Sequence, residues 1–267
     1  MFEIPKCKLV KGGNVPGGHH VICNGSKAPF ITPVKETNSI PLHHSDIVVD
    51  IGAYVGTYAI RCARFPVKKV IAYEPTPATF EILKKVNLPN YEIINAAVVG
   101  YEKDYINLHI SKGIGVTNST VLSNRKEQSI AVPAIRYEEA IKDATIVKID
   151  VEGAEYSFNI VQPQLRAIII DFHPIPKRPW IAKAKQIIAE IKKAGFETVV
   201  EPKWENGWTR AGSWIRPMQL QGECEPLMQG KQCCGCGVQI NTKTKGLCAS
   251  CFKLWSKEHR KGFETAT

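Results

Sequence analysis

The chain has 267 residues, of which 44% are hydrophobic and 22% are charged, and its formal net charge is +10. These fractions are ordinary for a globular protein, and the length allows a sizeable core. No apolar run reaches the roughly 18 residues that span a bilayer, and residues 1–5 lack the basic-then-apolar order of a signal peptide. We therefore expect a soluble, cytoplasmic protein with no membrane partner.

The sequence divides into three parts. Residues 1–44 are rich in glycine and proline, so we expect an extension of loops and short strands. Residues 45–221 alternate apolar runs with amphipathic segments and form the expected principal domain. Residues 222–267 hold six of the nine cysteines and form the expected appended module.

The principal domain is expected to form an α/β fold. Helices are predicted over residues 55–65, from Thr76 or Thr79 to about Val86, and over 180–193, where Gly195 ends the helix. The alternating segments 105–110 and 129–134 are a candidate strand pair. Apolar runs predict strands at residues 46–51, 69–74, 91–95, 145–151, 166–172, 196–201 and 211–215. This order predicts a doubly wound, mostly parallel, seven-stranded Rossmann-like sheet.

The most informative segment is residues 47–58, IVVDIGAYVGTY, which reads as a buried strand, a glycine turn and a helix start. This arrangement forms the usual ligand-binding crevice of an open α/β sheet. The turn is D-x-G-x-x-x-G and lacks the Gly-Lys-Ser/Thr ending of a phosphate-binding P-loop. Glu74 ends the next strand about 20 residues later, where a carboxylate accepts hydrogen bonds from ribose hydroxyls.

These residues resemble class I S-adenosylmethionine-dependent methyltransferases, and more closely the FkbM family. Four blocks carry the resemblance over about residues 40 to 200: Asp50-Ile51-Gly52-Ala53 with Gly56, Tyr73-Glu74-Pro75 with Phe80 and Leu83, Asn95-Ala96-Ala97-Val98, and Val147-Lys148-Ile149-Asp150-Val151-Glu152-Gly153-Ala154-Glu155. The last block is the most specific. The resemblance covers neither the first forty residues nor the cysteine-rich end.

The resemblance implies a set of cofactor contacts. Asp50 would lie by the methionine amino group, Glu74 would bind the ribose hydroxyls, and Asn95 and Ala96 would lie near the adenine. The full expected set is Asp50, Gly52, Ala53, Gly56, Glu74, Asn95 and Ala96. Taken alone, Asp50 or Glu74 would more readily be interpreted as a helix cap.

The expected catalytic residues are Asp150, Glu152 and His173, at the ends of two adjacent strands. Asp150 is the first candidate to position the acceptor or a metal ion. Glu152 or Glu155 would alternatively cap the following helix, where the dipole favours an acid. His173 would act as a general base or as a hydrogen-bonded residue at the rim. Lys148 and Asp150 match half of the Lys-Asp-Lys-Glu set of ribose 2′-O-methyltransferases, but Lys148 is expected inside the strand.

The cysteine spacing at the C-terminal end predicts a structural zinc site. Cys233 and Cys236 form one C-x-x-C pair, and Cys248 and Cys251 form a second after eleven residues. Two such pairs are typical of a four-thiolate zinc site, and Cys234 is the alternative to Cys233. Disulfides or free thiols are the other interpretations.

Together these patterns predict an S-adenosylmethionine-dependent O-methyltransferase that acts on a hydroxyl of a sugar, nucleotide or nucleic acid. No Asp/Asn-Pro-Pro-Tyr/Phe motif for amino-directed DNA methylation is present, which favours an oxygen acceptor. The alternative is a nucleic-acid methyltransferase or binding protein that uses the basic zinc module on DNA or RNA. A basic solvated surface explains the charge equally well. A divalent metal at the active site and a homo-oligomer are left open.

Overall fold

The computed structural model describes residues 40–65, 67–86, 88–110, 119–121, 128–176, 178–205 and 208–216. Near the amino terminus it also describes the backbone of three antiparallel strands, β1 (Cys7–Lys11), β2 (His19–Cys23) and β3 (Ser26–Lys27). The expected cysteine-rich module, including Cys233, Cys236, Cys248 and Cys251, lies outside the described residues.

A seven-stranded sheet forms the centre of the described fold, in the order β12-β15-β11-β10-β4-β5-β6. Its strands in chain order are β4 (Ile47–Ile51), β5 (Lys69–Tyr73), β6 (Tyr91–Ile94), β10 (Ile146–Ile149), β11 (Ala167–Ile170), β12 (Glu197–Val200) and β15 (Gly212–Ile215). Only β15 runs antiparallel to its neighbours in this sheet. The expected mostly parallel sheet is confirmed, and it is mixed because of this one strand.

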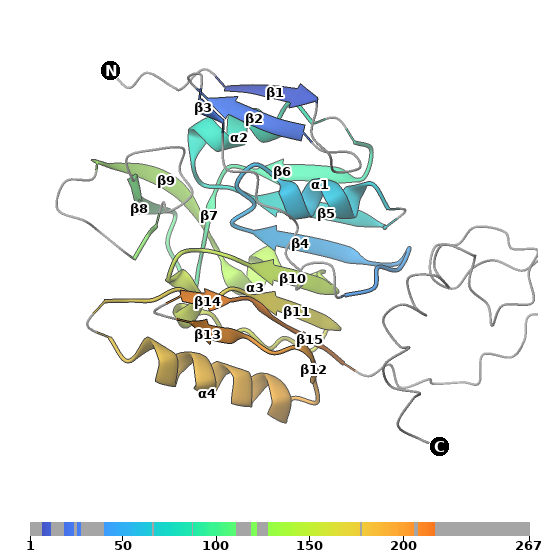
Figure 1. Cartoon of the computed structure of the whole chain (residues 1–267), viewed down its shortest axis with the longest axis vertical. Coiled ribbons are helices and arrows are strands. Elements are labelled where there is room, and N and C mark those ends of the chain that lie inside the picture. Colours follow the sequence, from blue (N-terminus) through green and yellow to red (C-terminus); the bar gives the residue numbers. More distant parts are fainter. Residues whose placement is uncertain are drawn as a thin grey trace, which may run out of the picture.

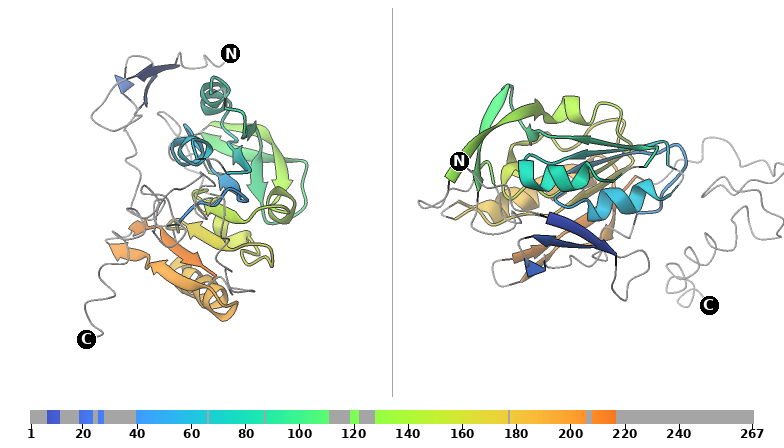
Figure 2. Two further views of the ribbon diagram at one scale, coloured as in Figure 1. Left: turned by 90° about the vertical axis from the view of Figure 1, so that its right-hand side faces the viewer. Right: turned by 90° about the horizontal axis from the view of Figure 1, so that it is seen from above.

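Helices cover both faces of this sheet, as side-chain alternation along its strands requires. On β4, Val48 packs in one core with α1 (Thr57–Ala63) and α2 (Pro77–Leu83), whereas Val49 packs in the opposite core with α3 (Tyr137–Ala140) and α4 (Trp180–Lys193). Figure 1 shows α1 and α2 near β5 and β6 and α4 beside β12. The turned views show the same separation (Figure 2).

A smaller three-stranded sheet, in the order β7-β9-β8, is formed by strands that follow β6 in the chain. Its strands are β7 (Ala97–Val99), β8 (Tyr105–Ile110) and β9 (Gln128–Arg136). The antiparallel pairing of β8 with β9 confirms the expected strand pair. The hairpin of β13 (Lys203–Glu205) and β14 (Trp208–Arg210) was not expected from the sequence.

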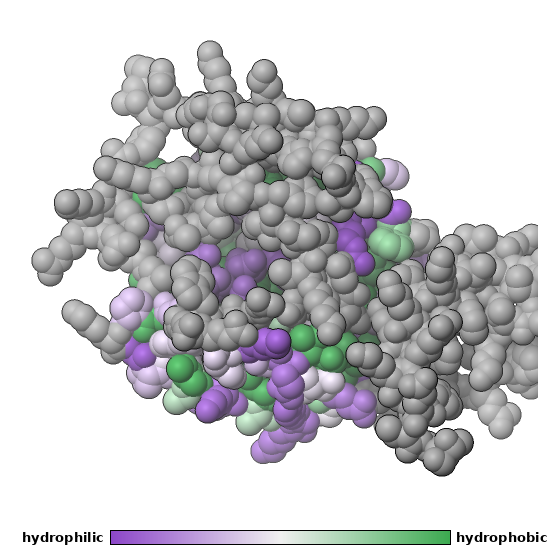
Figure 3. All heavy atoms as spheres, in the orientation of Figure 1, coloured by the Kyte–Doolittle hydropathy of each residue, from purple (hydrophilic) through white to green (hydrophobic). Residues whose placement is uncertain are grey.

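Helix α4 runs over the residues expected from its periodicity. Ala184, Ile187 and Ile191 form its buried face, and Gly195, at a φ of 85°, follows its end. With 14 residues it is the longest described helix, and none in the described ranges is long and apolar enough to cross a membrane. On the described part of the face in Figure 3, hydrophilic and hydrophobic residues are interspersed.

Candidate active site

The loop between β4 and α1 carries both expected glycines. Gly52 and Gly56 have φ angles of 78° and 80°, a region that a β-carbon disfavours. A β-carbon added at Gly52 would lie 1.8 Å from the carbonyl oxygen of Asp150, and one added at Gly56 would lie 2.5 Å from the Leu83 side chain. Gly52 is therefore required by close packing against the end of β10. This contact places the expected cofactor loop beside the expected catalytic segment.

Backbone strain is concentrated in the same two loops. Among the described residues, the non-glycine residues with positive φ are Tyr54, at 51°, and Glu152, at 53°. Tyr54 follows β4 and Glu152 follows β10, and these strands are parallel neighbours. Such strained conformations cluster at functional sites. The Ser119 hydroxyl donates a hydrogen bond of 2.7 Å to the Glu152 carbonyl and helps to hold that loop.

Glu74 joins the cofactor loop to the end of β5. Its Oε2 accepts from the Tyr54 amide at 2.8 Å, and its Oε1 accepts from the Thr76 amide at 2.8 Å and the Thr79 hydroxyl at 2.9 Å. Burial raises the pKa of Glu74, and these hydrogen bonds oppose the rise. Because a carboxylate oxygen has two lone pairs, Oε2 keeps one acceptor position beyond its bond to Tyr54.

The segment after β6 is tied to the same strand end. The side-chain amide of Asn95 donates to the carbonyl oxygens of Glu74 at 2.8 Å and Pro75 at 3.1 Å. Ala96 and Ala53 are both buried. The expected ribose and adenine residues therefore lie side by side at the carboxyl ends of β5 and β6.

Asp50 is completely buried and pairs with Lys148. Its Oδ2 accepts from the Ala59 amide of α1 at 3.1 Å, and its Oδ1 lies 3.1 Å from Lys148 Nζ. Burial raises the pKa of Asp50, and Lys148 opposes the rise. Lys148 Nζ also lies 3.2 Å from Oδ2 of Asp150. Asp50 thus anchors α1 and orients Lys148, which reaches the catalytic segment.

The expected catalytic residues converge at the carboxyl ends of β10 and β11. His173 Nε2 lies 3.5 Å from Asp150 Oδ1 and 3.5 Å from Glu152 Oε1. Asp171 joins this group: one ligand atom from each of Asp150, Asp171 and His173 lies within 4.8 Å of the other two. The side chain of Asp150 is 37% exposed, so the group faces solvent on one side.

Glu155 lies fully buried behind His173. Its Oε1 accepts from the His173 backbone amide at 2.6 Å and lies 3.4 Å from Nδ1 of the imidazole. Its Oε2 accepts from the Gly153 amide at 2.8 Å, and the Tyr156 hydroxyl donates to the His173 carbonyl at 2.8 Å. The expected helix after β10 is instead a single 3-10 turn, η1 (Ala154–Ser157), so neither Glu152 nor Glu155 caps an α-helix here.

The titratable side chains of this group shift one another's pKa values. Burial alone would lower the pKa of His173, but the carboxylates of Glu155, Asp150 and Glu152 raise it to about 10. Burial raises the pKa of Glu152 to about 7, against the opposing charge of His173. Burial would also raise the pKa of Asp150, but Lys148 and His173 lower it. His173 therefore holds a proton at neutral pH in this arrangement, and a general-base role would require that proton to leave first.

Comparison with protein families identifies the chain. Residues 50–198, more than half of its length, match the model of the Methyltransferase FkbM domain. The chain belongs to the FkbM methyltransferase family. It is therefore an S-adenosylmethionine-dependent methyltransferase, as the sequence resemblance implies. No curated protein matches the chain.

The chain also matches parts of solved structures of other methyltransferases. M. jannaschii TYW2 in complex with AdoMet is 13% identical, with a TM-score of 0.42 over 81% of this chain and 90% of that chain. Precorrin-6y C5,15-methyltransferase from Geobacter metallireducens GS-15 is 10% identical, with a TM-score of 0.41 over 71% and 93%. An rRNA methylase from Streptococcus thermophilus is 12% identical, with a TM-score of 0.40 over 71% and 99%. At these low values, the family match remains the finding that identifies the chain.

The sequence analysis placed Lys148 inside its strand and did not include it among the expected site residues. The structure places it at the centre of the site because it faces Asp50 in register across the β4-β10 pair. A lysine within a buried apolar strand was the available signal, since a buried charge needs a partner. Asp171 was not among the expected site residues, although side-chain alternation from Ile169 would have placed it on the same face as Lys148.

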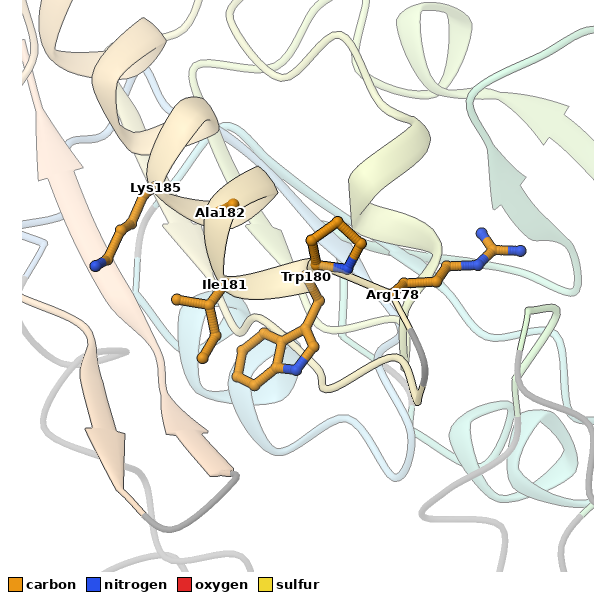
Figure 4. A pocket seen from close by; sticks show the side chains of 6 residues that line it. Arg178, Trp180, Ile181, Ala182 and Lys185 are labelled. Atoms are coloured by element: carbon orange, nitrogen blue, oxygen red, sulfur yellow. The ribbon is translucent and has the colours of Figure 1, made fainter.

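A separate surface hollow of about 400 Å³ lies at the start of α4. It is lined by Arg178, Pro179, Trp180, Ile181, Ala182 and Lys185. In Figure 4, Trp180 and Ile181 project to one side of the helix start, while Arg178 extends the other way. None of the expected cofactor or catalytic residues lines this hollow.

Proposed function

We propose that this methyltransferase transfers the methyl group of S-adenosylmethionine to a hydroxyl oxygen of a sugar, nucleotide or nucleic acid. The supporting observation is the group of Asp150, Glu152 and His173 beside the cofactor loop. The sulfonium already activates the methyl group, so the protein needs to align the acceptor and manage its proton. A hydroxyl must lose a proton as it attacks, and a carboxylate-rich strand end suits that requirement.

The cofactor would lie across the carboxyl ends of β4, β5 and β6. Glu74 would accept a ribose hydroxyl at Oε2, and Asn95 and Ala96 would border the adenine. Gly52, Ala53 and Gly56 would supply the close backbone. Asp50 is enclosed by protein, so it would support the methionine end through Lys148 and the start of α1.

The acceptor would bind on the solvent side of the catalytic group. Oδ1 of Asp150 would receive the hydrogen bond of the acceptor hydroxyl, because Lys148 already holds Oδ2. This Oδ1 lies on the side of Asp150 that faces His173. Glu152, in its strained loop, would border the same position. The acceptor hydroxyl would pass its proton to the Asp150 carboxylate as its oxygen takes the methyl group that S-adenosylmethionine supplies, which would leave S-adenosylhomocysteine.

An acceptor screen tests this assignment. Full-length protein is incubated with S-adenosylmethionine labelled in the methyl group and with pools of sugars, nucleosides, RNA or DNA. Mass spectrometry then locates the label in any product. We expect an O-methyl product that Asp150→Asn reduces about 100-fold and that the exposed Asp143→Asn leaves unchanged. A label on nitrogen or carbon would overturn the oxygen assignment.

The C-terminal cysteines favour nucleic acid among these acceptors. We propose that Cys233, Cys236, Cys248 and Cys251 bind a structural zinc ion, and that the surrounding basic residues bind DNA or RNA. Trp255 would stack on a base. Truncation after Gly222 is expected to preserve S-adenosylmethionine binding and abolish retention of nucleic acid at low salt. Full-length protein without salt-dependent binding to DNA or RNA would contradict this part of the proposal.

A further inference from the structure

Negative charge accumulates at the carboxyl ends of the central strands. Five carboxylates gather there, although the chain as a whole carries a net charge of +10. They belong to Asp50, Asp150, Glu152, Glu155 and Asp171. The cationic side chains described within this group are Lys148 and His173. A group of this composition favours an additional cation.

The distances between His173 and its carboxylate neighbours suit atoms that bind one metal ion together better than they suit direct hydrogen bonds. Charge-assisted N–H···O bonds are about 2.7–2.9 Å long, whereas Nε2 lies 3.5 Å from an oxygen of Asp150 and of Glu152. Two atoms each about 2.1 Å from one ion lie about 3.0–3.4 Å apart at octahedral to tetrahedral angles. The ligand atoms of Asp150, Asp171 and His173, all within 4.8 Å of one another, need small movements to reach that spacing.

His173 is held as a metal-binding histidine is held. The residue is 9% exposed, and its Nδ1 has no hydrogen-bond partner in the described structure. Nδ1 faces the buried carboxylate of Glu155 at 3.4 Å, while Nε2 points at the carboxylate group. Metal-binding histidines commonly present one ring nitrogen to the ion and the other to a carboxylate. The buried imidazole is therefore held with Nδ1 toward Glu155 and Nε2 toward Asp150.

We propose that Asp150, Asp171 and His173 bind one divalent cation through a carboxylate oxygen from each aspartate and Nε2 of the histidine, which releases its proton to solvent as the cation binds. Two oxygens and one imidazole nitrogen suit Mn²⁺ or Mg²⁺, with water in the remaining positions. Lys148 holds the second oxygen of Asp150 and makes that ligand monodentate. The role of the cation rests on the proposed function: it would bind the acceptor hydroxyl and ease the loss of its proton. The binding of the cation itself does not depend on the proposed function.

The test is a titration of full-length protein with Mn²⁺, followed through the electron paramagnetic resonance signal of free Mn²⁺. We expect one ion per chain. Asp171→Asn and His173→Gln should each weaken binding at least tenfold, and Mg²⁺ should compete. The exposed Asp143→Asn and His44→Gln serve as matched controls and should bind as the wild type does.

Two further measurements keep the outcome clear. Should a ligand variant fail to fold, selective broadening of the His173 imidazole NMR signals by Mn²⁺ in the wild type locates the ion. No binding at millimolar Mn²⁺, or unchanged affinity in folded Asp171→Asn and His173→Gln, would overturn the cation site. Calorimetry with S-adenosylmethionine alone separates this result from failure of the proposed function, because the cofactor residues lie on other strands.

Discussion

Lys148 and Asp50 lie opposite each other in adjacent parallel strands, with Nζ 3.1 Å from Oδ1. Asp50 is fully buried and the Lys148 side chain is 12% exposed, so the pair is largely shielded from water. Removing one partner of a buried pair leaves an uncompensated charge. The two residues therefore connect the stability of the sheet to the geometry of the site.

We predict that Lys148→Met lowers the free energy of unfolding by about 3 kcal/mol or more. The matched control is Lys192→Met, which removes the 3.0 Å pair with Glu201, where the side chains are 47% and 63% exposed. That change should cost less than about 1 kcal/mol. Urea denaturation measures both. Equal costs for the two variants would contradict a shielded role for Lys148.

Gly52 offers a test of the contact between the cofactor loop and β10. Gly52→Ala should destabilise the protein more than Gly195→Ala, although both glycines have positive φ. An alanine β-carbon at 195 meets nothing within 4 Å, so that variant reports the conformational cost alone, about 1 kcal/mol. At position 52 the β-carbon would overlap the Asp150 carbonyl. Thermal denaturation should show the difference, and similar losses would argue against the close contact.

At the end of the sheet opposite the site, the ion pair of Asp46 and Arg166 is expected to make the stability of the protein depend on pH. Arg166 Nε lies 2.7 Å from Oδ1 of Asp46, and the Thr145 hydroxyl donates to the same oxygen at 2.8 Å. Burial would raise the pKa of Asp46, but Arg166, together with hydrogen bonds from the His43 amide and the Thr145 hydroxyl, holds the pKa below its usual value. A lowered folded-state pKa gives stability that is present above the unfolded pKa and lost as pH falls through the folded value.

Asp46→Asn should therefore cost about 2 kcal/mol at pH 7, and this cost should shrink as the pH falls below about 4. Urea denaturation of both proteins between pH 3 and 7 measures the difference. A cost that stays constant over this range would show that the Asp46 charge does not contribute.

Much of the fold was predictable because its signals are local. The strands 46–51 and 69–74 and the helix over 180–193 follow from apolar periodicity and from Gly195, and the structure places β4, β5 and α4 there. The turn η1 was missed, because a helix was expected after β10, with Glu152 or Glu155 as the alternative capping acid. In the structure Glu155 accepts from the backbone of His173, 18 residues away in sequence.

The site was predictable as a set of residues but not as a network. Asp150, Glu152 and His173 were expected together from the family resemblance. Their partners were not, since the Lys148–Asp50 contact joins residues 98 apart and depends on strand order and register. Local sequence patterns contain no information on that pairing.

Glu74 provides a test of the cofactor assignment. Glu74→Gln should weaken S-adenosylmethionine binding about tenfold or more, because an amide replaces one acceptor oxygen with a donor. Glu92→Gln is the matched control, since Glu92 pairs on the exposed surface with Lys69. Circular dichroism should show that both variants are folded. Unchanged affinity in Glu74→Gln would place the ribose elsewhere.

Calorimetric titration of S-adenosylmethionine into the full-length protein tests the central claim most directly. We predict saturable binding of one cofactor per chain, with competition by S-adenosylhomocysteine. This titration requires neither the acceptor nor a divalent cation. Absence of binding by folded protein at millimolar S-adenosylmethionine would contradict the assignment of this chain as an active methyltransferase.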